Sequence, residues 1–185
     1  MKTRFLGALL SAITFCNAGI MLAAGGLDDP ICKIVIDAMT KTSRTPFHSY
    51  STMGSIMDGA KPIEIETITI GELAYTRSGG EWQVSKGKPM VDEFIEQMTS
   101  ARAPISCEYE RDDPSQGEAA AVYRVRLGES DGVIDSRLWV SKTRGLLLHT
   151  TADIPLDEAV THVSVRYDYT NVKAPKVGPP DAPKK

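Results

Sequence analysis

The sequence lacks the motifs that mark several well-known classes of enzyme. Its 185 residues include only three histidines and three cysteines, and none of them falls in the spacing of a zinc site or of a Cys-x-x-Cys redox pair. No Gly-x-Ser-x-Gly turn, phosphate-binding loop or dinucleotide fingerprint is present in the sequence, so it offers no motif for nucleophilic catalysis or nucleotide chemistry. We therefore predict no enzyme, no metal site and no cofactor.

Clusters of positive charge are also missing. The chain has 21 Lys and Arg against 24 Asp and Glu, a net charge of −3, and no basic run before Lys184 and Lys185. Phosphate backbones are bound by clustered Lys and Arg. The composition therefore argues against nucleic-acid binding.

The one long apolar run lies at the N-terminus. Lys2 and Arg4 precede a mostly apolar stretch over 5–22, and small residues follow at 23–25, which is the pattern of a cleaved export signal over residues 1–25. A membrane anchor that stays in place and a lipid on Cys16 are the alternatives. We therefore expect the signal to be cleaved and the mature protein to be in the periplasm.

Removal of Cys16 with the signal leaves one pair of cysteines, Cys32 and Cys107. In an exported chain a lone pair predicts a disulfide. Two buried thiols, or a redox or metal pair, are the alternatives.

Apolar residues at helical spacing predict two amphipathic helices. Asp29 and Pro30 suit the cap and the first turn of a helix that ends before Pro46. Its apolar stripe consists of Ile31, Ile34, Val35, Ala38 and Met39. A second helix follows Pro89, ends before Pro104, and has a stripe of Val91, Phe94, Ile95 and Met98.

Most of the remaining chain has the alternation of antiparallel strands. The expected segments are 47–53, 63–70, 73–77, 82–84, 105–109, 122–127, a hairpin over 137–149 that turns at Gly145, and 161–171. Within 63–70 the apolar positions switch from odd to even, which predicts a bulge or burial on both faces.

Two helices can cover only one face of so many strands. We therefore predict an α+β fold, in which a strongly curved antiparallel β-sheet, an incomplete β-barrel, wraps around the two helices. The domain is expected over residues 26–173. The proline-rich residues 174–185 predict a disordered tail.

Several features together resemble the LolA-like superfamily of cell-envelope proteins, which includes the RseB and LppX types. They are the leading helix, a hairpin with Tyr75 and Trp82, the second helix, and the strand, polar turn and glycine from Arg137 to Leu146. The resemblance covers about residues 28 to 173. It implies a half-barrel with helices over an apolar cavity that binds acyl chains or lipoproteins. The cysteine pair and segment 45–50 depart from the superfamily pattern and indicate a separate subfamily.

On such a fold the interior is the candidate site. The expected cavity residues are Phe94, Met98, Ile95, Met90, Trp139 and Tyr75. The methionines at 39, 53, 57, 90 and 98 can adapt to irregular apolar ligands. In a closed fold they are core residues instead.

The polar candidates are weaker. His48, His149 and His162 are expected to be surface or capping residues, with His48 nearest the mouth of the half-barrel. Two acidic pairs are also considered: Glu64 with Glu66, expected on the solvated side of a strand, and Asp112 with Asp113, expected in a loop that has the residues for calcium.

The sequence predicts an exported, monomeric binding or carrier protein that holds a hydrophobic small molecule or lipid in a half-barrel cavity. The alternative is a non-enzymatic module with a filled core that binds an envelope protein through its surface or a sheet edge.

Overall fold

The computed structural model describes residues 28–55, 61–87, 89–99, 105–129, 132–156 and 159–177. The expected export signal, Met57 and residues 178–185 lie outside the described residues. The boundaries predicted for the signal and the tail therefore stay predictions.

The first helix, α1 (Pro30–Ser43), begins and ends where the sequence predicts. Asp29 accepts a hydrogen bond from the Ile31 backbone N–H at 2.7 Å, and Pro30 occupies the first turn. The second helix, α2 (Met90–Thr99), is shorter. Neither of these two described helices is long and apolar enough to span a membrane.

The predicted orientation of α1 needs one correction. Its buried residues are Cys32, Val35, Ala38, Met39 and Thr42, whereas Ile34 is 46% exposed. The disulfide bond of Cys32 holds that residue against the sheet, so the buried stripe of the helix includes Cys32. The rotation turns Ile34 toward the flank of the helix.

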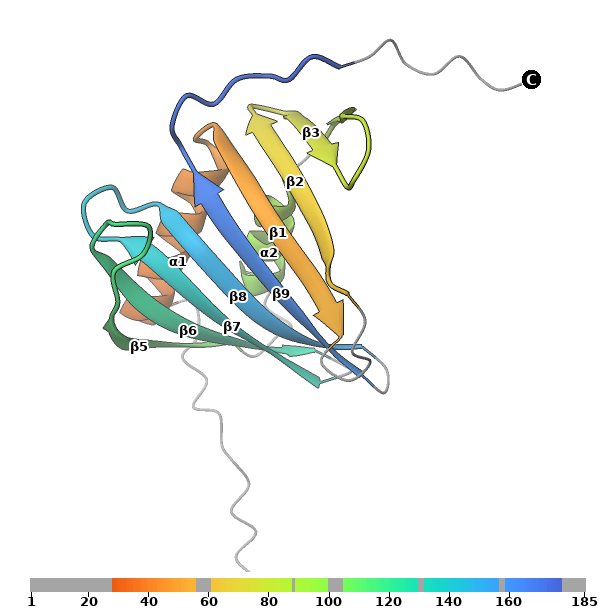
Figure 1. Cartoon of the computed structure of the whole chain (residues 1–185). Coiled ribbons are helices and arrows are strands. Elements are labelled where there is room, and N and C mark those ends of the chain that lie inside the picture. The colour runs from red at the N-terminus through yellow and green to blue at the C-terminus, as the bar shows by residue number, and fades with distance from the viewer. Residues whose placement is uncertain are drawn as a thin grey trace, which may run out of the picture.

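The strands form one antiparallel sheet that does not close, as predicted (Figure 1). The order is β4-β3-β2-β1-β9-β8-β7-β6-β5, so β4 and β5 are the two edges. The strands are β1 (Phe47–Ser55), β2 (Ile63–Ile70), β3 (Leu73–Arg77), β4 (Gln83–Lys86), β5 (Ile105–Asp112), β6 (Ala120–Glu129), β7 (Gly132–Ser141), β8 (Leu147–Leu156) and β9 (Ala159–Asp168). The first strand of the chain, β1, thus pairs with the last strand, β9.

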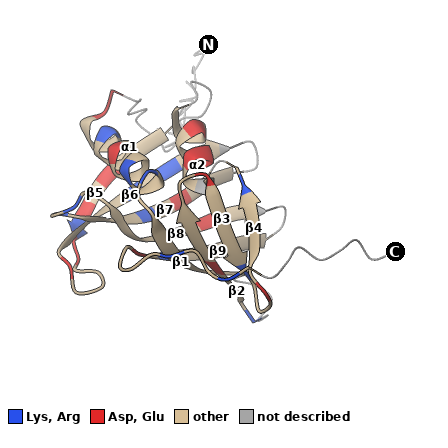
Figure 2. Ribbon diagram, turned by 90° about the horizontal axis from the view of Figure 1, so that it is seen from above, with Lys and Arg blue, Asp and Glu red and all other residues tan. Residues whose placement is uncertain are grey.

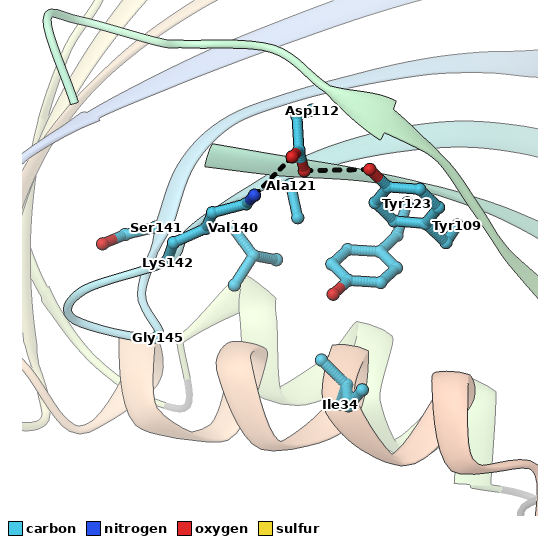
Figure 3. A pocket seen from close by; sticks show the side chains of 9 residues that line it. All are labelled: Ile34, Tyr109, Asp112, Ala121, Tyr123, Val140, Ser141, Lys142 and Gly145. Carbon is cyan, nitrogen blue, oxygen red and sulfur yellow. Dashed lines mark hydrogen bonds and ion pairs between the residues drawn. The ribbon is translucent and has the colours of Figure 1, made fainter. Parts of the chain in front are cut away.

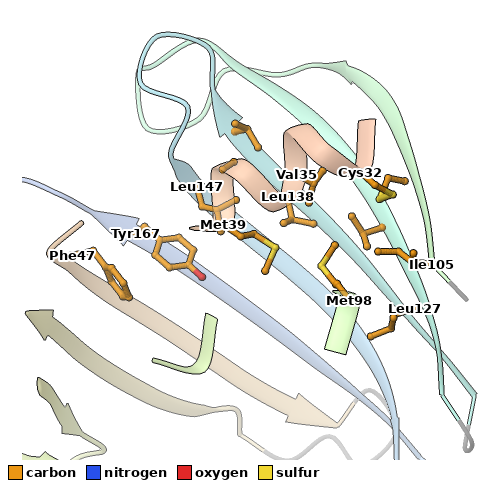
Figure 4. Packing of buried hydrophobic residues seen from close by; sticks show 14 residues of the cluster. Cys32, Val35, Met39, Phe47, Met98, Ile105, Leu127, Leu138, Leu147 and Tyr167 are labelled. Atoms are coloured by element: carbon orange, nitrogen blue, oxygen red, sulfur yellow. A yellow bond between two sulfur atoms is a disulfide. The ribbon is translucent and has the colours of Figure 1, made fainter. Parts of the chain in front are cut away.

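Both helices lie on one side of the sheet, here called the helix side (Figure 2). Helix α1 packs against α2 and against β5, β7 and β8. The main core lies between α1 and these strands (Figure 4). It includes Val35, Met39, Met98, Val125, Leu127, Leu138 and Leu147, each at most 3% exposed.

The predicted disulfide is present between Cys32 and Cys107. It joins α1 to the edge strand β5 across 75 residues of sequence. Both cysteines belong to the core cluster, with Cys32 fully buried and Cys107 8% exposed.

In strand β2, the predicted switch of apolar residues from odd to even positions corresponds to burial on both faces. Its pairing with β1 and β3 shows no register shift. Ile68 is 7% exposed and its neighbour Thr69 is 4% exposed, although they point to opposite faces. Bulges occur elsewhere, between Tyr109 and Arg111 and between Trp139 and Val140.

One side chain bridges β8 and β9 at the end of the sheet where these strands separate. The regular pairing stops at His149 and Arg166. Just beyond it, the Gln116 amide donates to the carbonyl oxygens of Leu148 at 2.6 Å and Tyr167 at 3.1 Å. The loop between β5 and β6 is thereby fixed across two strands.

Candidate functional site

The helix side of the sheet is only half covered. One row of register partners crosses the sheet from β2 to β5 and consists of Ile63, Met53, Val163, Ala152, Ser136, Val125 and Cys107. Within this row Val125 is fully buried, Met53 is 39% exposed and Ile63 is 56% exposed. Along this row, cover therefore ends between β8 and β1, whereas at the other end of the same face Phe47, Ser49 and Thr69 are buried.

The uncovered part presents an apolar surface. The next row along the strands places Ile65, Ser51 and Val165 beside one another. Ile65, Val163 and Val165 are half-buried. We call the set Met53, Ile63, Ile65, Val163 and Val165 the open strip.

Three of the residues expected in a cavity lie on the side of α2 that packs on the core. Phe94 and Ile95 are half-buried and contact the core cluster, as does Val165 of the open strip. Met98 is fully buried and belongs to the core itself. The side chain of Met90 lies outside what the structure describes.

The two other expected residues, Trp139 and Tyr75, lie on the opposite, outer face. Trp139 lies between two core residues of β7, so alternation turns it away from the helices. Its ring packs on His149, with 4.6 Å between centroids, and its Nε1 donates to Asp113 at 3.2 Å. Tyr75 is in register with Ile68, on the face that also carries His48.

The outer face carries a network of paired polar groups. His48 Nε2 lies 2.7 Å from Glu66, which also binds Arg77. Burial raises the pKa of Glu66, but the hydrogen bonds from Arg77 and His48 outweigh it and hold that pKa below its ordinary value. The Tyr50 ring stacks on His48 and contacts the Arg166 guanidinium. These side chains already bind one another, which favours a structural role.

The other two histidines do not converge with His48 on a site. His149 Nε2 lies 2.9 Å from the Ser164 hydroxyl, and His162 pairs with Asp153 at 2.7 Å. Burial, followed by the nearby Arg166, lowers the pKa of His149. Within the described ranges no three His, Cys, Asp or Glu side chains are grouped so that they could hold a metal ion.

A groove of about 500 Å³ opens beside α1 on the side of the edge strand β5 (Figure 3). Its lining includes Ile34 and the rings of Tyr109 and Tyr123, which meet edge-on at 6.0 Å. Asp112 accepts a hydrogen bond from Tyr109 at 2.9 Å and pairs with Lys142 at 2.5 Å. Sequence periodicity missed this groove because it placed Ile34 in the core.

The sequence did contain a signal for the open strip. Glu64 and Glu66 mark the outer face of β2, so Ile63 and Ile65 must point to the helix side. In β9 the same alternation places Val163 and Val165 on one face and His162 and Arg166 on the other. What the sequence could not give is the position of the helices, which decides which of these apolar residues remain exposed.

Several solved structures are similar to this chain. They include LprF from Mycobacterium bovis (TM-score 0.47, 12% identity, 79% of this chain and 96% of that one). A complex of MucA and MucB from Pseudomonas aeruginosa matches with TM-score 0.40 and 12% identity over 77% of this chain, but over only 58% of the solved chain. A LolA superfamily protein from Nitrosomonas europaea matches with TM-score 0.32 and 10% identity over 75% of this chain and 91% of its own.

The open antiparallel sheet with two helices on one side is the half-barrel architecture that the sequence predicts (Figure 2). The likenesses to these solved structures are distant, with identities of at most 12% and TM-scores of at most 0.47. No family model matches the chain, and no curated protein matches it in sequence.

Proposed function

We propose that this protein is an exported binding protein of the periplasm that holds a hydrophobic, acyl or lipid-like ligand on the open strip. One observation supports it most directly. A single row of side chains runs from full burial at Val125 to 56% exposure at Ile63. The helix side is therefore a filled core at one end and an uncovered apolar surface at the other.

An uncovered apolar surface of this kind favours a ligand. Burying a large aliphatic side chain contributes about 1.5–3 kcal/mol relative to leaving it exposed. The open strip contains five apolar side chains on adjacent strands: Ile63 is 56% exposed, Met53 is 39% exposed, and the other three are half-buried. An apolar ligand would remove this surface from water without rearrangement of the core.

Phe94 and Ile95 are the helix residues that we assign to the same site. They are half-buried and pack on the core from the side of α2. Met53 supplies a flexible thioether that can adapt to an irregular ligand. Met98 supports this wall from inside the core, whereas Tyr75 and Trp139 have no part in the site.

The proposal is tested by titrating the protein with a fluorescent apolar probe, such as a pyrene-labelled acyl compound. Ile63→Ser should weaken binding several-fold, because it removes an apolar side chain from the strip. Val84→Ser is the matched control, since Val84 is 50% exposed but lies on the outer face in register with Tyr75. Equal effects of the two substitutions would contradict the proposed site, as would a wild-type protein that binds no probe.

A second candidate function is the binding of an envelope protein through the groove beside α1. Ile34 is 46% exposed and Tyr109 is 49% exposed, and both line that groove. Native mass spectrometry of the exported protein distinguishes the two functions. A lipid adds a small mass to the chain, whereas a protein partner adds a mass of many kilodaltons.

A further inference from the structure

We propose that the open strip selects an acyl amphiphile whose head group is uncharged and carries hydroxyls, in preference to a fatty acid or an anionic phospholipid. This inference rests on the proposed function and adds the chemical class of the head group. It comes from the distribution of charge between the two faces of the sheet.

The helix side of the strands that carry the open strip, and of β3 and β4 beside them, carries no charge. In β1, β2, β3, β4 and β9, all of which are described in full, every Asp, Glu, Lys and Arg falls at an outer-face position. These residues are Glu64, Glu66, Arg77, Lys86, Arg166 and Asp168. A negative head group on the helix side would therefore find no cation on these strands.

The neighbouring helix makes the helix side less favourable still for an anion. Helix α2 contains Asp92, Glu93 and Glu96 and neither Lys nor Arg, and Figure 2 shows these acidic positions as red bands on the helix. Like charges repel, and the repulsion grows as water is displaced. An anionic head group beside α2 would thus be penalised both by lost hydration and by the carboxylates of Asp92 and Glu93.

Neutral hydroxyls lie next to the open strip, farther along the same face of β2 and β3. Thr67 and Thr76 are register partners on β2 and β3, with 3.5 Å between their Oγ1 atoms. Both are half-buried, and Ser85 and Gln83 beside them are exposed. Thr67 follows Ile63 by four residues, which is about 13 Å along a strand. This face therefore offers the apolar open strip for a chain and, beside it, the hydroxyls of Thr67 and Thr76 for a head group.

This arrangement matches hydroxyl chemistry. A hydroxyl donates one hydrogen bond and accepts others, so the side chains of Thr67, Thr76 and Ser85 can pair with a hydroxyl head in either direction. An ionised carboxylate that leaves water without a cationic partner loses far more hydration free energy than it regains from such groups. We expect the uncharged amphiphile to bind at least about tenfold more tightly than its anionic counterpart, a difference that corresponds to about 1.4 kcal/mol.

The first test compares three probes that share one pyrene-labelled acyl chain: a monoacylglycerol, the free fatty acid and a lysophosphatidylglycerol. Titrations at about pH 8 keep the fatty acid ionised. The expected order places the monoacylglycerol at least about tenfold tighter than either anion. Equal or tighter binding of the anions by the wild-type protein would overturn the head-group inference and leave the proposed function standing.

The second test places a cation beside Thr67. Thr76→Lys should tighten fatty-acid binding about tenfold, because it places a cation beside the head group, and it should weaken monoacylglycerol binding, because it removes one of the hydroxyls. Thr52→Lys is the matched control, because Thr52 is exposed and lies on the outer face opposite Glu64, and it should change neither affinity. No response to Thr76→Lys in a variant with normal thermal unfolding would contradict the placement of the head group.

The two proposals fail in different ways. If none of the three probes binds the wild-type protein, the proposed function is wrong and the head-group inference falls with it. If all three bind with similar affinity and Ile63→Ser weakens each equally, the site is right and its selectivity is wrong.

Discussion

Thr42 offers the sharpest test of how α1 is held on the sheet. Its side chain is fully buried near the C-terminal end of the helix. The Thr42 Oγ1 atom accepts a hydrogen bond from the Leu147 backbone N–H at 3.0 Å and lies 3.4 Å from the Tyr169 hydroxyl. That hydroxyl in turn donates to the Leu147 carbonyl oxygen. Helix α1, strand β8 and the segment after β9 therefore meet at one threonine.

The substitution Thr42→Val keeps the shape of the side chain and removes the acceptor. Leu147 is 1% exposed, so its N–H would remain buried without a partner. A buried polar group left unpaired costs about 1–3 kcal/mol. Because valine fills the same space, no cavity adds to this cost. We expect the free energy of unfolding to fall by about 2 kcal/mol.

The measurement is urea unfolding followed by tryptophan fluorescence. Thr45→Val is the matched control, since the Thr45 hydroxyl donates at 2.8 Å to the Lys41 carbonyl oxygen at the exposed end of the same helix. It should change the free energy of unfolding by less than about 0.5 kcal/mol. Thr42→Ser retains the hydroxyl and should lose only about 1 kcal/mol with its methyl group. Equal losses for Thr42→Val and Thr45→Val would refute the reasoning.

Other predictions concern the core and its charged edge. Replacing both Cys32 and Cys107 with alanine should lower the free energy of unfolding in urea by up to about 4 kcal/mol, from the loop entropy of the unfolded chain; unchanged stability would contradict this. Met98→Ala should cost about 2–5 kcal/mol by the same assay, and a loss below about 1 kcal/mol would show that the space around this buried side chain is not filled. Hydrogen bonds from Arg144, opposed by burial, hold the pKa of Glu118 at about 2, below its ordinary 4.5. This depressed pKa stabilises the fold above about pH 4.5, and the contribution is lost as the pH falls toward 2. Thermal unfolding across this range should therefore show a shallower acid loss in Glu118→Gln, and parallel curves would argue against the pairing.

Local signals in the sequence were enough to place the elements. Asp29 and Pro30 define the start of α1 because they satisfy or omit the free amides of its first turn. Alternation identified β9 and assigned its faces, with Val163 and Val165 on one face and His162 on the other. The disulfide followed from the count of cysteines in a chain expected to be exported. The first two of these inferences depend on neighbours in the sequence, and the third depends on the number of cysteines.

Long-range packing decided what the sequence could not. Trp139 and Tyr75 are large and amphipathic, and only the register of their strands shows that they lie on the outer face. The sequence periodicity of α1 is compatible with burial of Ile34, and the bond of Cys32 to β5 selects a different rotation. Exposure of Ile63 depends on where the helices end, which no local pattern records.

Methyl NMR of the isotope-labelled protein tests the central claim most directly. Titration with a monoacylglycerol should shift the methyl signals of Met53, Ile63 and Val163 on the open strip. The signals of Val84 on the outer face and Ile34 in the groove should remain in place. Shifts confined to Ile34 and its neighbours, or no shifts at saturating probe, would contradict a ligand site on the uncovered half of the helix side.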